Sequence, residues 1–226
     1  RPTLIVFGKS MFLHPEPVKQ LRSCIQAIPD YRPLVMYDAA HVLGILGSYF
    51  QDPLAEGADV VTGSTHKTFF GPQRGIIASN MNTDTPLSGL WKEITARTFP
   101  GMTSNHHLGT QLAMLSATIE MNAYKNEYQL QVLSNARAFA KYCASQGMPV
   151  EGGEAEEYTH THQVLLRVAD FGDAKEVAHR MESNNIITNY QALPGDTTFY
   201  RPSGIRMGVQ EMTRYGMKEK DFEQLA

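Results

Sequence analysis

Short apolar runs alternate with amphipathic stretches along the first half of the chain. Each run is rich in Val, Ile or Leu and stops at a glycine or a polar cluster, as buried strands do. Between the first two runs, residues 15–28 start at prolines and place Val18, Leu21 and Ile25 on one helical face, which predicts a helix. The predicted strands of this half are 3–8, 33–41, 58–66 and 74–80.

The second half begins with a long helical pattern. From Leu108 to about Gln146 the chain is rich in Ala, Leu, Met and Gln, which predicts either two helices or one long helix joining two domains. After "GMPVEGG" the composition changes, and helices are expected at 173–185, capped by Asp173, and at 217–226. The predicted strands of this half are 161–171, 186–190 and 204–209.

This order of elements indicates the fold class. Strands that alternate with helices favour an α/β protein with a mostly parallel sheet, and the mixture after the long helix favours a smaller α+β C-terminal domain. Neither an internal repeat nor a low-complexity segment interrupts the pattern.

Composition and charge narrow the class of protein. The 226 residues carry a net charge of -3, which argues against nucleic acid or an anionic membrane as a partner. Cys24 and Cys143 are far apart and show no CxxC spacing, so we expect a reducing, cytoplasmic environment. The chain contains neither a signal-peptide pattern nor an apolar run of membrane-spanning length.

Three polar residues lie at or just beyond the ends of predicted parallel strands: Ser10, Asp38 and Lys67. Ligands of open α/β sheets bind at that edge. Asp38 by itself could simply cap a turn, and Lys67 could be a solvated surface lysine. Their separation, 67 − 38 = 29 residues, is one strand and its connection, so the two side chains can converge, with His41 close by.

A lysine at such a site can form a Schiff base with a carbonyl compound. Pyridoxal-phosphate enzymes need this lysine, a carboxylate that keeps the pyridine nitrogen protonated, and donors for the phosphate. No acidic residue stands beside Lys67 in "GSTHKTFFGPQRG". A salt bridge would stabilise the ammonium form, so the lack of a local acid favours the nucleophilic amine.

Several segments together resemble one family. "DAAHVLGIL" and "ADVVTGSTHKTFFGPQRG" closely resemble motifs of serine hydroxymethyltransferases, and "RPTLIVFGKSMF", "FPG" and "SGIRMGVQEMTRYGM" match in the same order. The resemblance implies a three-layer, mostly parallel sheet of the pyridoxal-phosphate transferase fold type I. It further implies that residues 1–118 are the C-terminal portion of the cofactor-binding large domain, and that 119–226 are a linker helix and a small α+β domain. The chain then looks like a fragment that lacks the N-terminal part.

The resemblance also implies roles for individual residues. Lys67 would carry the cofactor, Asp38 would pair with the pyridinium nitrogen, and Arg206 would hold the substrate carboxylate. His41 and Ser10 would lie around the ring hydroxyl. The residues expected near the phosphate or the lysine are Ser64, Thr65 and His66.

The chain departs from the family pattern at four places. Gln73 and Arg74 follow the Gly-Pro where the family has Arg-Gly, "MTSNHH" (102–107) replaces a glycine-rich segment after "FPG", "HTHQ" (160–163) replaces D-N-H-L, and "QALP" (191–194) replaces N-x-V-P. These differences leave the cofactor residues in place and weaken the expectation of folate binding.

The expected activity is interconversion of serine and glycine, with Cα–Cβ cleavage and one-carbon transfer to tetrahydrofolate. One alternative is a folate-independent transaldolase or aldolase, or a methylserine-type relative. Another is an inactive family member that acts as a partner subunit. We expect a homodimer that binds an amino acid. Since no Cys or carboxylate stands at ligand spacing from the histidine pairs 106–107 and 160/162, we predict no metal site.

Overall fold

In a computed structural model of the chain, residues 1–81 and 87–226 are described, and they form two compact units. The division falls between residues 125 and 126, inside a helix, and the domain boundary expected after residue 118 stays a prediction. Unit 1 consists of Arg1–Ser10 and Glu16–Lys125, and unit 2 consists of Met11–Pro15 and Asn126–Ala226. The short segment 11–15 therefore belongs to unit 2 although unit 1 flanks it on both sides.

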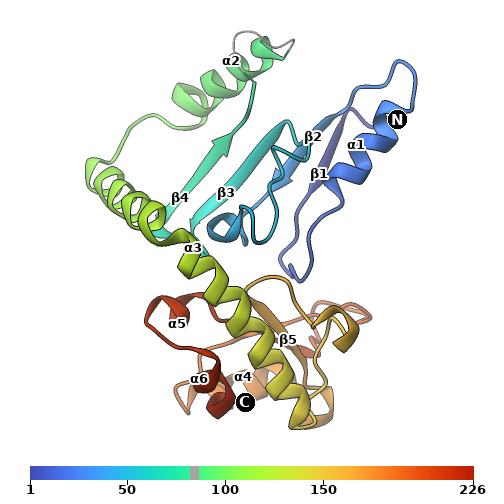
Figure 1. Cartoon of the computed structure of the whole chain (residues 1–226), viewed down its shortest axis with the longest axis vertical. Coiled ribbons are helices and arrows are strands. Elements are labelled where there is room, and N and C mark those ends of the chain that lie inside the picture. Colours follow the sequence, from blue (N-terminus) through green and yellow to red (C-terminus); the bar gives the residue numbers. More distant parts are fainter. Residues whose placement is uncertain (82–86) are drawn as a thin grey trace. The chain divides into compact units, whose positions relative to one another are not determined.

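Unit 1 contains a four-stranded mixed sheet with its strands in sequence order (Figure 1). The first three strands are parallel, and the fourth is antiparallel to the third because only three residues connect them, too few for a crossover. The predicted α/β class is confirmed. The strands are β1 (Leu4–Phe7), β2 (Leu34–Asp38), β3 (Val60–His66) and β4 (Phe70–Ala78).

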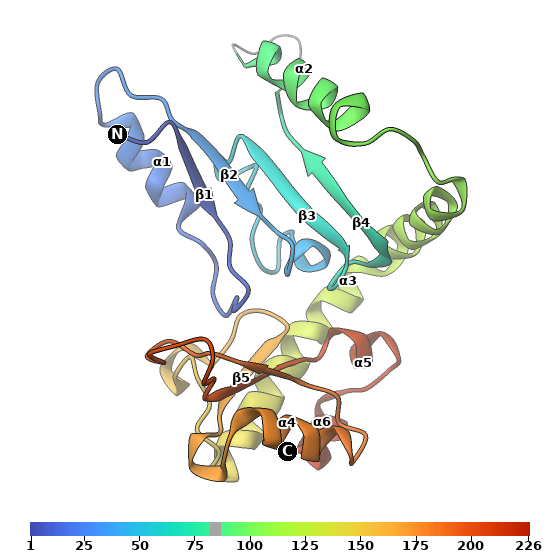
Figure 2. The same cartoon turned by 180° about the vertical axis from the view of Figure 1, so that it is seen from behind.

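The helices of unit 1 include one that was not among the predicted elements. α1 (Val18–Gln26) lies beside β1 in both views and buries Val18 and Ile25, as its spacing indicated (Figure 2). α2 (Ser88–Ala96) has no buried residue, although Leu87, Leu90, Trp91 and Ile94 stand at helical spacing in the sequence. The remaining helices are η1 (Leu43–Ile45), η2 (Arg97–Met102) and α3 (Leu108–Ser145), the last continuing into unit 2.

The two faces of this sheet differ in burial. Along β2, Val35 and Tyr37 are buried, whereas the alternate residues Leu34, Met36 and Asp38 are only half-buried. Strand alternation and register place Leu4 and Val6 of β1 on the half-buried side, where they are 48% and 56% exposed. The core of unit 1 therefore lies on one side of the sheet, and the other side is apolar and open.

Unit 2 is built around a three-stranded antiparallel sheet in the order β5-β7-β6. Asp173 caps α4 by accepting a hydrogen bond from the Lys175 N–H at 2.8 Å, as predicted. The strands are β5 (Gln163–Arg167), β6 (Asn189–Gln191) and β7 (Gly204–Gly208). The helices are η3 (Glu154–Glu156), η4 (Ala169–Phe171), α4 (Ala174–Glu182), α5 (Gln210–Arg214) and α6 (Glu219–Leu225), with the second part of α3.

The second part of α3 supplies much of the core of unit 2. Its Phe139 packs against Phe222 of α6 with ring centroids 5.5 Å apart. Asn135 is fully buried, and its amide donates to Thr213 Oγ1 and to the Met217 carbonyl, both at 2.9 Å. Because a buried amide is costly without partners, these bonds fix the C-terminal helices against α3.

No helix among the described residues combines the length and the apolar character needed to cross a lipid bilayer.

Candidate active site

Lys67 directly follows β3, and its amine is held on one face of the sheet. Alternation along β3 directs Ser64 to the half-buried side, whereas Gly63 and Thr65 face the buried side. Lys67 Nζ donates a hydrogen bond to Ser64 Oγ at 3.1 Å. The lysine side chain therefore turns back over the strand that precedes it, and its amine lies on the open face.

Asp38, the last residue of β2, points to the same face. It is paired in register with Thr62 of the neighbouring strand β3, and Ser64 lies two residues further along that strand. Adjacent strands are about 4.8 Å apart and each residue advances about 3.3 Å, so the Cα atoms of Asp38 and Ser64 are about 8 Å apart. The carboxylate and the amine thus occupy neighbouring strand ends on one side of the sheet, as the 29-residue separation predicted.

The backbone beyond β1 packs tightly against Asp38. Gly8 has a φ of 127°, and a Cβ added to it would come within 2.7 Å of the Asp38 Cβ and 2.6 Å of its carbonyl oxygen. Asp38 Oδ1 accepts the Ala40 N–H at 2.8 Å, which is the turn-capping role weighed from the sequence. Among the described residues, Oδ2 has no partner within hydrogen-bonding distance, so this oxygen remains for a ligand.

Thr68 joins the turn after β2 to the segment after β3. Its side chain is fully buried, and its hydroxyl donates to the His41 carbonyl and accepts the Gly44 N–H, each at 3.0 Å. Since Thr68 is bonded to Lys67 in the chain, this pair of hydrogen bonds fixes where the lysine leaves the sheet. The sequence analysis missed this residue; the only signal was a hydroxyl adjacent to the lysine.

Thr65 and His66, both expected near a phosphate, differ in environment. The Thr65 side chain is 1% exposed, and its hydroxyl lies 2.6 Å from the Pro72 carbonyl and accepts the Arg74 N–H at 3.1 Å. In this structure it therefore stabilises the hairpin between β3 and β4. His66 is exposed at the end of β3. Contact of either residue with a phosphate stays a prediction.

Of the three remaining candidates, His41 is half-buried in the turn after β2, and the other two lie outside this cluster. Ser10 is exposed, three residues beyond β1. Arg206 is half-buried in the central strand β7 of unit 2, in register with Leu165 of β5 and Asn189 of β6. Desolvation by burial lowers the pKa of the Arg206 guanidinium, which nevertheless keeps its charge at neutral pH. The residues that the structure brings together in unit 1 are therefore Asp38, Ser64 and Lys67.

The electrostatic setting of Lys67 agrees with the local sequence. Within residues 1–81 and 87–226, no carboxylate lies within ion-pair distance of its amine, and its hydrogen-bond partner is the neutral Ser64 hydroxyl. The lysine is half-buried, so it is partly removed from water. An amine in this setting can attack a carbonyl group more readily than one that a salt bridge holds in the ammonium form.

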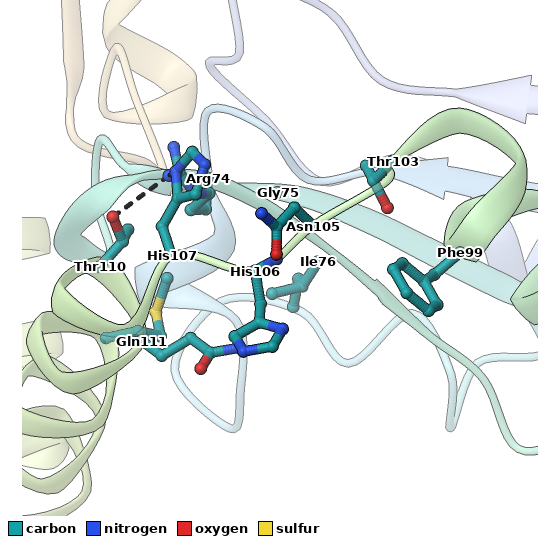
Figure 3. A pocket seen from close by; sticks show the side chains of 11 residues that line it. Arg74, Gly75, Ile76, Phe99, Thr103, Asn105, His106, His107, Thr110 and Gln111 are labelled. Carbon is teal, nitrogen blue, oxygen red and sulfur yellow. Dashed lines mark hydrogen bonds between the residues drawn. The ribbon is translucent and has the colours of Figure 1, made fainter.

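Unit 1 also contains a cavity of about 780 Å³ between β4 and the start of α3 (Figure 3). Arg74 reaches into it and donates to Thr110 Oγ1 at 3.1 Å; it also lies 2.8 Å from His107 Nδ1, which must accept because a guanidinium carries only donors. This cavity is lined by residues from two places where the chain departs from the serine hydroxymethyltransferase pattern, Arg74 and the segment 102–107. The other lining residues that the figure labels are Gly75, Ile76, Phe99, Thr103, Asn105, His106 and Gln111.

Comparison with known structures supports the fold. The chain is 34% identical to an L-threonine transaldolase from Pseudomonas fluorescens, solved in its internal aldimine state, with a TM-score of 0.85. That alignment covers 99% of this chain and 48% of the transaldolase.

Comparison of sequences identifies the family. The serine hydroxymethyltransferase profile matches residues 1–226. A serine hydroxymethyltransferase of Archaeoglobus fulgidus is 46% identical over 229 residues, and one of Methanothermobacter thermautotrophicus is 44% identical over 229 residues. Both alignments cover 100% of this chain and 50% and 52% of the relatives, so the chain spans about half the length of the curated relatives that it matches. The match along its whole length, together with the strand-end lysine and aspartate, means that the chain belongs to the serine hydroxymethyltransferase family.

Proposed function

We propose that the chain is the lysine-bearing part of a pyridoxal-phosphate enzyme that cleaves the Cα–Cβ bond of a β-hydroxy amino acid and transfers the one-carbon unit to tetrahydrofolate. The observation that carries the proposal is the hydrogen bond from Lys67 Nζ to Ser64 Oγ. It holds a lysine amine on the same sheet face as the Asp38 carboxylate, and family membership supports the reaction class.

The residues present fit pyridoxal phosphate. The ligand needs an amine for its aldehyde and a carboxylate for its ring nitrogen, and Lys67 and Asp38 offer both on one face of the sheet. Gly8 leaves the approach to Asp38 free where any side chain would collide with it. The half-buried apolar face beside them suits an aromatic ring.

Each residue then has a defined task. When bound, the cofactor supplies an electron sink for the charge left on Cα. Lys67 supplies the amine that bonds to the cofactor aldehyde, and Ser64 orients that amine. Asp38 would hold the ring nitrogen and keep it protonated, while its Oδ1 accepts the Ala40 N–H. The roles of Ser10, His41 and His66 around the ring and phosphate remain part of the proposal.

Arg206 is proposed to bind the α-carboxylate of the amino acid. Its planar guanidinium can grip a carboxylate through two parallel hydrogen bonds, which lysine cannot reproduce. Its half-buried position in β7 supports this role, because a partly desolvated cation interacts more strongly with an anion. Arg206→Lys should raise the KM for serine at least about tenfold and leave cofactor content unchanged. An unchanged KM would remove this role.

The deciding experiment measures serine cleavage in the intact protein with and without tetrahydrofolate. We expect glycine to form, and formation to be faster with tetrahydrofolate present. Equal rates without folate would reject the transferase reading while keeping the cofactor chemistry. No turnover of any β-hydroxy amino acid by cofactor-loaded protein would reject the proposal and favour a non-catalytic partner subunit.

A second candidate function is folate-independent transaldolase or aldolase activity. The structural likeness to an L-threonine transaldolase supports it, as does the departure from the family pattern at 191–194. Threonine and an acceptor aldehyde replace serine and folate in the assay. A new β-hydroxy amino acid, formed at a rate that folate does not change, would favour this reading over the first.

A homodimer is part of the same proposal. The unit 1 part of α3 exposes an apolar stripe at helical spacing, and monomeric proteins seldom leave such stripes open. The stripe consists of Leu108, Leu112, Leu115 and Ile119, which are 66%, 65%, 56% and 62% exposed. In light scattering, Leu112→Asp should shift the intact protein from dimer to monomer; an unchanged mass would exclude this face.

A cytoplasmic location also remains a proposal. Both cysteines are free thiols, Cys24 exposed and Cys143 buried, as expected in a reducing compartment.

A further inference from the structure

Three side chains of unit 2 gather in a cluster that the proposed reaction does not use. His14, Glu156 and His160 each direct a potential metal-ligand atom to a common point, and these atoms all lie within 4.8 Å of one another. The two imidazole rings are 5.1 Å apart between centroids and meet edge to face at 87°. The sequence pattern pairs His160 with His162 as a possible metal-binding pair and gives no indication of His14.

The backbone fixes both histidines. The segment 11–15 is anchored by the His160 N–H, which donates to the Leu13 carbonyl at 2.7 Å, and by the Phe12 N–H, which donates to Gln163 Oε1 at 2.8 Å. The Thr161 hydroxyl also donates to the Phe12 carbonyl. His14 and His160 are therefore held close together by the chain itself, whatever their rings bind.

A tight loop places Glu156 beside the two histidines. The two residues after it, Glu157 and Tyr158, both have positive φ, at 52° and 65°, which turns the chain sharply before His160. Gly152 supports this turn: a Cβ there would lie 1.9 Å from the Tyr158 carbonyl oxygen. The loop thus places one carboxylate beside two imidazoles.

Two other acidic residues of this region, Glu151 and Glu157, have ion-pair partners. Glu151 pairs with Arg167 at 2.6 Å, and Glu157 lies 3.5 Å from Arg137 and 3.6 Å from Lys141. Glu156 has no ion-pair partner among the described residues. The carboxylate that faces the histidines is therefore available for a cation that the protein does not itself supply.

We propose that His14, Glu156 and His160 bind a Zn²⁺ ion, with water as the fourth ligand. Two imidazoles and one carboxylate suit zinc, whereas Mg²⁺ and Ca²⁺ prefer oxygen ligands alone. Tetrahedral ligands at about 2.1 Å from zinc lie about 3.4 Å from each other. The cluster needs to contract only modestly to reach that spacing, and the exposed Glu156 side chain can make the movement.

The bound ion would cross-link two segments of unit 2. It links the segment 11–15, whose first residue follows Ser10, to the loop that precedes β5. Binding requires neutral imidazoles and occurs only when the two segments are folded together, so it stabilises unit 2 and weakens in acid. This site departs from the sequence-based expectation of no metal, because His14 and His160 are 146 residues apart (160 − 14) and no spacing rule connects them.

The test measures Zn²⁺ binding by calorimetry in the intact protein after chelation and dialysis. We expect one ion per chain and a higher unfolding temperature with zinc. X-ray absorption of the bound ion should show two imidazoles and one carboxylate. His14→Ala, His160→Ala and Glu156→Gln should each weaken binding more than about tenfold. Glu156→Gln carries the test if a histidine variant fails to fold, because its side chain is exposed.

The matched control replaces two histidines outside the proposed site, His106 and His107, which belong to unit 1. The double variant His106→Ala and His107→Ala should leave zinc affinity unchanged. Zinc binding that this control abolishes, or binding that Glu156→Gln leaves intact, would overturn the proposal. Absence of binding at millimolar zinc would overturn it as well. Because the calorimetric readout does not involve turnover, it is independent of the proposed enzymatic function.

Discussion

Lys67 Nζ donates a hydrogen bond to Ser64 Oγ at 3.1 Å, so the lysine that follows β3 folds back over the same strand. The register between β2 and β3 places Asp38 on that face as well. One amine and one carboxylate therefore occupy adjacent strand ends, with no acid among the described residues pairing with the amine. This relationship is the structural basis of the proposed cofactor site.

Replacing the lysine tests covalent attachment directly. Lys67→Ala should abolish the mass increase that borohydride reduction fixes in cofactor-loaded protein, because Lys67 supplies the amine on the sheet face that Asp38 shares. Lys9→Ala is the control: Lys9 is a half-exposed lysine of the same unit, paired with Glu16 at 2.9 Å. A modified peptide that contains residue 67 should appear in the control and in the parent protein. Modification of a different lysine would refute the assignment.

Ser64→Ala removes the hydrogen-bond partner of the amine without changing its charge. One such bond contributes about 1 kcal/mol, so we expect cofactor capture to slow roughly fivefold. Stopped-flow absorbance after mixing with cofactor measures that rate. Ser23→Ala, whose hydroxyl bonds to the Lys19 carbonyl of its own helix, should leave that rate unchanged. Equal rates in all three proteins would mean that Ser64 does not orient the lysine.

Thr68→Val should destabilise unit 1. The change keeps the shape of the side chain but removes the buried hydroxyl that bridges the His41 carbonyl and the Gly44 N–H. We expect the free energy of unfolding to fall by about 1–3 kcal/mol in urea titrations. Thr118→Val is matched to it, since that hydroxyl bonds only to the Met114 carbonyl one helical turn away at an exposed position. A smaller decrease in the free energy of unfolding for Thr68→Val than for Thr118→Val would contradict the bridging role.

Asp196 gives unit 2 a defined dependence on pH. Hydrogen bonding from the Ser203 side chain and from the Leu193 and Ser203 N–H groups lowers the pKa of its carboxyl group, and Arg167 adds attraction at 3.8 Å. A lowered pKa in the folded state gives stabilisation that is complete above the ordinary aspartate range and is lost as the pH falls through the folded value.

Asp196→Ala should therefore lower the unfolding temperature near neutral pH, and the difference from the parent should shrink in acid. Circular-dichroism melts at a series of pH values measure it. Asp170→Ala, an exposed carboxylate in η4, is the control and should change little at any pH. A difference between parent and Asp196→Ala that grows in acid would reverse the assigned sign.

The two thiols should differ in reactivity. Cys143 is 3% exposed, and burial raises the pKa of its thiol to about 11, so it has neither access nor thiolate at neutral pH. Cys24 is exposed on α1. A thiol reagent should label one cysteine rapidly and the second only in denaturant. Cys24→Ser should remove the fast phase, whereas a fast phase that persists would show that Cys143 is accessible.

Local patterns were sufficient to predict most elements. The apolar runs predicted every strand of both sheets to within a few residues, and the spacing of Val18 and Ile25 predicted α1. They were not used to predict α2 and α5. α5 is five residues long, too short to show a repeating apolar face, whereas α2 carries Leu87, Leu90, Trp91 and Ile94 at helical spacing and could have been predicted.

The sequence by itself determined the family and the α/β class, and it singled out Lys67 and Asp38 as candidates, because contiguous motifs and strand ends encode them. Only the tertiary structure decided which groups meet. In the folded chain the Thr65 hydroxyl bonds within the β3–β4 hairpin, and the Thr68 hydroxyl bridges His41 and Gly44. The rings of His14 and His160 lie next to each other. These contacts join residues far apart in the chain, or depend on which face of a strand a side chain takes, and local spacing does not record either.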